Sequence, residues 1–230
     1  MNILDSLLWY VVFILSATVH EAAHAWAAKR GGDLTAYAGG QVSLNPLPHI
    51  RRQPLGMVVL PIASSLLIGW PFGYASTPYD PAWAHRSPRK AGLMAAAGPG
   101  ANLLMLLICA AAIKAGIVAG VFLQPQSVGL QHIIDPGSRA LTGAAMFVSM
   151  VFSLNLIMLV LNLLPLPPFD GSALITVFLS SDAARRYRSI ISNPVFGLLG
   201  LLLAWQVFNP VFTAVFLRVI NILYWGSGYA

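Results

Sequence analysis

Long apolar stretches constrain this chain more than any other feature of its sequence. Of its 230 residues, 57% are hydrophobic and only 9% are charged, a balance far from that of a soluble domain. Several stretches approach or exceed the roughly 20 apolar residues that a helix needs to cross a bilayer. Because backbone groups in lipid must be paired within the segment that carries them, such stretches fold as helices. The sequence therefore predicts an all-α polytopic membrane protein with about four transmembrane helices.

The predicted elements form one membrane-embedded domain over residues 1–230. The transmembrane segments are expected at 1–28, 91–122, 140–171 and 195–225. Residues 55–85 are interrupted by prolines and glycines, which favours a re-entrant segment and a loop over a full crossing. Residues 34–48, with a Gly-Gly pair at 39–40, predict a short β-hairpin.

The basic residues lie in short clusters between the apolar stretches. The net charge of +6 therefore indicates membrane orientation and contact with the lipid bilayer, and not binding to nucleic acid. The basic clusters lie on one side of the membrane only if the 55–85 segment returns to the side from which it entered. Basic loops favour the cytoplasmic side, so we expect that side to be the cytoplasm. The single cysteine, Cys109, excludes a disulfide framework.

The first apolar stretch carries three ionisable side chains, in the pattern His20-Glu21-x-x-His24. On a helix, His20 and His24 lie one turn apart on the same face, where two imidazoles can hold one metal ion. Glu21, the only Glu in the chain, is placed to take a proton from a water at that metal. The alternative is a pair of core histidines beside a stray acid. Unpartnered ionisable groups at membrane depth would be costly, which favours the metal site.

A catalytic zinc usually has three protein ligands and one open position. A downstream Glu is absent, and Ala27 and Arg30 stand where another common extension has Gly and His. Asp170 alone among the remaining acids and histidines ends a strongly apolar stretch, and the prolines before it and Gly171 after it would turn its carboxylate inward. The alternative is a helix-capping Asp. The other candidates are His49, His85, His132, Asp33, Asp80, Asp135 and Asp182.

These motifs together resemble the site-2 protease family of intramembrane zinc metalloproteases. The resemblance rests on His20-Glu21-x-x-His24 and on Asn162-x-x-Pro165-x-Pro167-x-Phe169-Asp170-Gly171. Gly98-Pro99-x-x-Asn102 is similar to the family's central motif, and Ser43-Leu44-Asn45-Pro46-x-x-His49 is similar to a segment of compact bacterial and archaeal members. Two departures are visible: Phe169 stands where Leu is usual, and the PDZ and CBS modules of many relatives are missing.

The resemblance implies a zinc metalloendopeptidase with one Zn²⁺ per chain. His20, His24 and Asp170 would hold the ion, and Glu21 would be the general base. Such an enzyme hydrolyses peptide bonds within or near the transmembrane segments of other proteins, in regulated intramembrane proteolysis or in clearance of membrane peptides. Its partners are a transmembrane protein or peptide substrate and the bilayer. We expect it in a prokaryotic inner membrane with the active site nearer the cytoplasm. The oligomeric state is open.

Two asparagines and two rival functions complete the predictions. Asn102 and Asn162 place amide donors in apolar stretches, where they would bind the substrate backbone or an oxyanion, or equally a neighbouring helix. The 34–48 hairpin would hold an extended substrate, or simply cover the site. A transporter or metal carrier would use the same ligands, but the apolar stretches offer few ionisable residues for a polar path. An inactive scaffold for transmembrane partners would have little need for Glu21.

Overall fold

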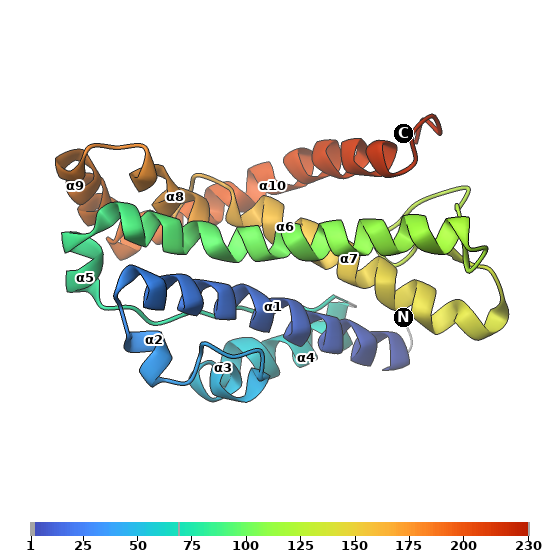
Figure 1. Ribbon diagram of the computed structural model, residues 1–230, viewed down its shortest axis with the longest axis horizontal. Helices are drawn as coiled ribbons and strands as arrows, with labels where there is room; N and C mark the ends of the chain where they lie inside the picture. Colours follow the sequence, from blue (N-terminus) through green and yellow to red (C-terminus); the bar gives the residue numbers. More distant parts are fainter. Residues whose placement is uncertain (1–2, 69, 230) are drawn as a thin grey trace.

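Four long apolar helices form the body of the protein. The computed structural model describes residues 3–68 and 70–229, and its long helices lie lengthwise in the molecule (Figure 1). Each helix is long and apolar enough to cross a membrane, so the predicted polytopic all-α fold is confirmed for the described residues. The helices are α1 (Ile3–Gly31), α6 (Pro88–Val118), α7 (Thr142–Asn162, preceded by the turn η2 at Arg139–Leu141) and α10 (Pro194–Leu223).

Helix α6 packs against both α1 and α7, which it crosses; α1 and α7 also contact one another, and α10 packs on α7 (Figure 1). Large side chains from the packed faces, including Trp9, Ile113 and Phe152, are fully buried in one continuous core. The outer faces stay apolar, and on α10 all five leucines between positions 198 and 203 are exposed together with Trp205. Such exposed apolar faces are suited to contact with the acyl chains of a membrane.

The apolar helix after α3 (Pro46–Arg52) is too short to cross a bilayer. It runs over Leu55–Ile68, as the π-helical turn η1 (Leu55–Val59) followed by α4 (Leu60–Ile68). Fourteen residues rise about 21 Å, against about 30 Å of hydrocarbon. The chain then runs back in extended form to α5 (Pro81–Arg86), which lies at the same end of the molecule as the last turn of α1 (Figure 1). This course matches the predicted re-entrant segment.

The β-hairpin predicted over 34–48 is wrong. Those residues form two short helices, α2 (Thr35–Ala38) and the start of α3 (Pro46–Arg52). The Asp33 side chain accepts the backbone N–H of Thr35 at 2.9 Å, and the Asn45 side chain accepts that of Leu47 at 3.0 Å. Asn45 followed by Pro46 is therefore an N-cap and first helical residue, a local signal stronger than the apolar alternation.

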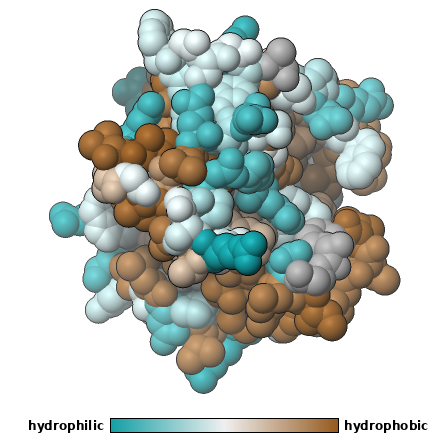
Figure 2. Space-filling model, turned by 90° about the vertical axis from the view of Figure 1, so that its right-hand side faces the viewer, coloured by the Kyte–Doolittle hydropathy of each residue, from teal (hydrophilic) through white to brown (hydrophobic). Residues whose placement is uncertain are grey.

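The antiparallel pair of strands lies instead in the connection between α6 and α7. There β1 (Phe122–Leu123) pairs with β2 (Asp135–Pro136). The connection also buries Ile133, whose N–H donates to Ser149 Oγ at 3.0 Å and whose carbonyl accepts the Tyr224 hydroxyl at 2.7 Å. Figure 2 shows this end of the molecule, with hydrophilic residues across its middle and hydrophobic residues along its sides and lower margin. The connection thus closes one end of the bundle.

The opposite end carries the short helices. After α7 the chain passes through a proline-rich loop into α8 (Asp170–Leu174), the turn η3 (Ile175–Val177) and α9 (Ser181–Ile191). The loop is pressed against α10, because a Cβ on Gly200 would lie 1.7 Å from the carbonyl oxygen of Pro167. This contact fixes the loop that leads into Asp170.

Candidate metal centre

The two histidines of the first helix face one another as their spacing predicts. His20 and His24 lie one turn apart on α1, and their Nε2 atoms are 3.0 Å apart. Both side chains are buried, at 5% exposure each, in the middle of the helix bundle. Two imidazoles therefore present their outer nitrogens to a single point between α1 and the neighbouring helices.

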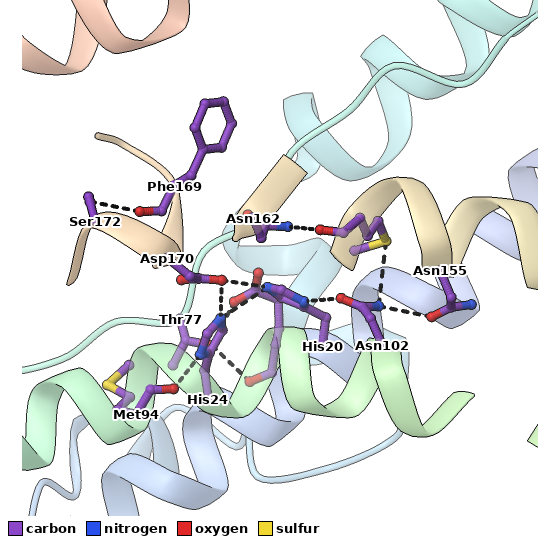
Figure 3. A network of polar contacts seen from close by, with 12 residues as sticks. His20, His24, Thr77, Met94, Asn102, Asn155, Asn162, Phe169, Asp170 and Ser172 are labelled. Carbon is purple, nitrogen blue, oxygen red and sulfur yellow. Dashed lines mark hydrogen bonds and ion pairs between the residues drawn. The ribbon is translucent and has the colours of Figure 1, made fainter. Parts of the chain in front are cut away.

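Asp170 completes the group from the other end of the sequence. Its Oδ2 lies 3.2 Å from the Nε2 atoms of both His20 and His24 (Figure 3). Asp170 is the first residue of α8, and Gly171 behind it is pressed against the end of α7. A Cβ on Gly171 would lie 2.5 Å from the carbonyl oxygens of Leu163 and Leu164. Only glycine allows this approach, which aims the Asp170 carboxylate back at the histidines.

The hydrogen bonds of the two imidazoles leave lone pairs at the centre. His20 Nδ1 lies 2.6 Å from Asn102 Oδ1, and His24 Nδ1 lies 2.7 Å from the carbonyl oxygen of Met94. Both partners are acceptors, so each Nδ1 carries the proton and each Nε2 has a free lone pair. Asp170 Oδ2 is likewise buried without a hydrogen-bond donor among the described residues.

This donor set fits a zinc ion. Three lone-pair atoms at separations of 3.0 to 3.2 Å repel one another unless a cation lies among them. Tetrahedral zinc with bonds of about 2.0–2.1 Å separates its ligand atoms by about 3.3 Å, close to the spacing here. Two imidazoles and one carboxylate also leave the fourth position open, as a catalytic zinc requires. The structure therefore brings together the three predicted ligands, His20, His24 and Asp170.

A chain of side-chain amides supports the first histidine. Asn102 Nδ2 donates to Asn155 Oδ1 at 2.9 Å, and Asn155 Nδ2 donates to Ser16 Oγ at 3.0 Å. Asn102, Asn155 and Ser16 have no exposed surface and belong to α6, α7 and α1 respectively. Figure 3 shows the contact between Asn102 and Asn155. Three helices are therefore hydrogen-bonded to one another through the group that orients His20. The alternative considered for Asn102, a hydrogen bond between helices, is present in the structure. The same side-chain amide also bonds His20.

Helix α6 approaches the two histidines unusually closely. A Cβ on Gly98 would lie 2.3 Å from His24 Nε2 and 2.5 Å from His20 Nε2, so the space beside both nitrogens exists only because residue 98 is glycine. Pro99 follows inside the same helix. The Gly98-Pro99 pair thus lies directly against the candidate metal position.

The other two predicted site residues, Glu21 and Asn162, differ in their contacts. Glu21 is buried beside the histidines, and its Oε2 accepts the hydroxyl of Thr77 at 2.7 Å. Asn162 does not join the histidine network, because its amide donates to the carbonyl of Met158, one turn earlier in α7, at 3.0 Å. Sequence reasoning missed Asn155 and Thr77. Asn155 carries the same signal as Asn102, an amide within an apolar stretch, whereas Thr77 lies in a loop with no pattern to mark it.

A comparison with known proteins assigns the family. The model of peptidase family M50 matches residues 8–203, which include the whole His20/His24/Asp170 group. The chain belongs to peptidase family M50. The resemblance to the site-2 proteases is therefore confirmed, and with it the predicted enzyme class, a zinc metalloprotease, and the predicted Zn²⁺ cofactor.

M50 relatives of two kinds are similar to this chain, and both are named as candidate zinc metalloproteases. YwhC of Bacillus subtilis is 35% identical over 175 residues, which cover 74% of this chain and 69% of YwhC. Rip2 of Mycolicibacterium smegmatis is 29% identical over 177 residues, covering 75% of this chain, and Rip2 of Mycobacterium tuberculosis is 28% identical over 175 residues. The matched part spans 58% of either Rip2 protein. No solved structure gives a significant match.

Proposed function

We propose that this M50 protein hydrolyses peptide bonds within or near the transmembrane segments of other membrane proteins. One observation carries the proposal: the metal-ligand group lies inside a helix that is long and apolar enough to cross a membrane. His20 is eleven residues before the end of α1, which places it about 16 Å from that end along the helix axis. A peptide bond that reaches this group must therefore enter the bundle at membrane depth.

The side chains around the site have distinct roles in this proposal. When bound, zinc supplies an activated water and polarises the scissile carbonyl. Glu21 takes the proton of the attacking water and passes it to the leaving amine. Asn102 orients His20 and does not contact substrate, since both ends of its amide are occupied by His20 and Asn155. Asn162 keeps one amide N–H and its oxygen for the substrate backbone, because its one side-chain hydrogen bond within residues 3–68 and 70–229 uses a single N–H.

The orientation in the membrane follows from the charges. One end of the bundle collects the last turn of α1, the start of α6, and helices α5 and α9 (Figure 1). Under this proposal the positive-inside rule turns this end toward the cytoplasm, and the site lies nearer the cytoplasmic face of a prokaryotic inner membrane. The basic residues there are Lys29, Arg30, Arg86, Arg89, Lys90, Arg185, Arg186 and Arg188.

The rival functions predict different chemistry at the same ligands. A metal carrier would bind zinc without hydrolysing peptides and would not depend on Glu21. A scaffold would bind transmembrane partners with or without that acid. The contact between Thr77 and Glu21 favours the enzyme, because neither rival needs the carboxylate to be held in place.

The test is cleavage of a panel of single-span proteins in liposomes, with bound zinc measured on each variant. Wild type should cleave at least one substrate. Glu21→Gln should retain zinc and lose cleavage by roughly two to four orders of magnitude, since it removes a general base. Asp170→Ala should lose zinc as well as cleavage. Cleavage by Glu21→Gln at the wild-type rate, or full zinc occupancy in Asp170→Ala, would refute the proposal.

A further inference from the structure

A threonine from a distant loop contacts the proposed general base. Thr77 lies in the extended segment between α4 and α5, and its hydroxyl is 2.7 Å from Glu21 Oε2 and 2.9 Å from the Glu21 carbonyl oxygen. Both residues are buried, with Thr77 at 9% and Glu21 at 5% exposure. The contact joins positions 56 residues apart in the sequence, so it exists only in the folded bundle.

The segment around Thr77 is fixed on both sides. Before it, the Tyr74 N–H donates to the Gly56 carbonyl at 3.1 Å, and a Cβ on Gly56 would lie 2.2 Å from the Tyr74 carbonyl oxygen. After it, the Asp80 N–H donates to Asp33 Oδ2 at 2.9 Å. These contacts hold the backbone of residue 77 in place independently of Glu21.

The chemistry of this contact is that of a hydroxyl donor to a carboxylate. A glutamate side chain has three rotatable torsions, and burying one of its oxygens without a donor is costly. A hydroxyl carries a single proton, and the carboxylate is the nearer of its two acceptors. Donation to Oε2 selects one orientation of the carboxylate and leaves the other oxygen, Oε1, for the attacking water. A hydrogen bond to a charged acceptor is stronger than one to a neutral acceptor.

We propose that Thr77 is a positioning residue for Glu21, holding the carboxylate in the orientation that accepts the proton of the attacking water. The proposal deepens the proposed function and rests on Glu21 being the general base. It assigns a role to the segment that returns from the re-entrant helix: the segment brings one hydroxyl to the catalytic carboxylate. Proton transfer depends steeply on the reach and alignment of the base, so loss of the hydroxyl should slow the reaction without removing the metal.

Three variants isolate the hydroxyl. Thr77→Val replaces it by a methyl group of similar size, and Thr77→Ser keeps it. Ser76→Ala is the matched control, because Ser76 is the neighbour of Thr77 and bonds Gln53 instead of Glu21. Each variant is purified with zinc bound, and its zinc content and thermal unfolding midpoint are measured beside the kinetics. The midpoint reports any loss of folding separately.

The kinetic arm uses a single-span substrate cleaved by wild type. Thr77→Val should lower kcat about 10- to 100-fold, with KM within about twofold and zinc content unchanged. Thr77→Ser and Ser76→Ala should stay within about threefold of wild type. Adding Thr77→Val to Glu21→Gln should cause no further loss, because the two residues act as a unit. Equal kcat for wild type and Thr77→Val overturns the proposal, as does a Thr77→Ser variant no better than Thr77→Val.

A binding arm decides the role of Thr77 even if no substrate is cleaved. Acetohydroxamate chelates zinc and carries an acidic hydrogen that a neighbouring carboxylate accepts. Its affinity, measured by calorimetry, should fall about tenfold in Thr77→Val and in Glu21→Gln, and stay unchanged in Thr77→Ser. Cleavage by no variant, wild type included, would count against the proposed function alone. Unchanged hydroxamate affinity in Thr77→Val would count against the positioning role alone.

Discussion

A single methyl group on α6 should remove the metal. In Gly98→Ala, the new Cβ would lie 2.3 Å from His24 Nε2 and 2.5 Å from His20 Nε2, whereas ordinary contacts begin near 3.4 Å. Both nitrogens must therefore retreat by about 1 Å, five times the tolerance of about 0.2 Å for zinc ligands. The imidazoles cannot swing aside freely, because Asn102 and the Met94 carbonyl hold their other nitrogens at 2.6 and 2.7 Å.

The expected loss of zinc affinity is about 100-fold or more. Changes to groups that only support metal ligands already cost about 10- to 100-fold, and this change displaces two ligands at once. A factor of 100 corresponds to about 2.7 kcal/mol of binding free energy. The helix itself should not suffer, since alanine favours a helix interior over glycine by about 1 kcal/mol. Loss of metal should therefore occur in a protein that remains folded.

Gly100→Ala is the matched control for this substitution. It lies two residues further along α6, and a Cβ there would meet nothing within 4 Å. Zinc affinity is measured by competition with a chromophoric chelator, and folding by thermal unfolding in detergent. Gly100→Ala should bind zinc as wild type does. Wild-type zinc affinity in Gly98→Ala would refute the placement of the metal between the two histidines and α6.

The remaining predictions concern groups further from the metal. Asn102→Ala should weaken zinc binding about 10- to 100-fold, because His20 loses its orienting acceptor. Asn162→Ala should leave zinc affinity unchanged, because this amide bonds its own helix, at the Met158 carbonyl, and no predicted ligand within the described part of the chain. Equal zinc affinities in the two variants would contradict this assignment. Burial acts to raise the pKa of Asp33, but hydrogen bonds from Thr35 and from the Asp80 N–H outweigh it and hold this pKa below its usual range. The resulting stabilisation is present above the unfolded pKa of about 4 and is lost as the pH falls through the lowered folded-state pKa. The unfolding midpoint of Asp33→Asn should therefore lie below that of wild type at pH 7, and the two midpoints should approach one another in acid. A difference between the midpoints that stays constant down to a pH of about 3 would argue against stabilisation by the ionised Asp33 carboxylate.

The spans and the ligands follow from strong local signals. Length and near absence of charge mark a transmembrane helix whatever its neighbours do, so α1, α6, α7 and α10 could be predicted from the sequence. The pairing of His20 and His24 follows from helical spacing alone. Asp170 is harder, because its place depends on how the loop after α7 folds. The prolines and Gly171 indicate a break there, and only the structure shows that Gly171 fits under the end of α7.

The errors have equally local causes. Residues 34–48 contain an apolar alternation that suggests strands. The Asn45 side chain instead caps α3, and the Asp33 side chain accepts the N–H of Thr35, the first residue of α2. The polar residues of the apolar stretches raise a different difficulty. Asn102 and Asn162 carry the same signal, yet one bonds a histidine and the other its own helix. Which face of a helix meets which neighbour is a tertiary property, and periodicity in one stretch does not determine it. Thr77, in a loop, had no signal at all.

The separation of the ligands along the chain has a consequence for synthesis. His24 and Asp170 are 146 positions apart, so the ion cannot be held until α7 and α8 have been made and packed against α1. Zinc then acts as a cross-link that forms only in the folded protein. Each tenfold rise of free zinc above its dissociation constant adds about 1.4 kcal/mol to the free energy of unfolding. A partly translated chain contains the histidines and the base but no complete site. Zinc binding by all three ligands is therefore a property of the chain only after α8 has been made.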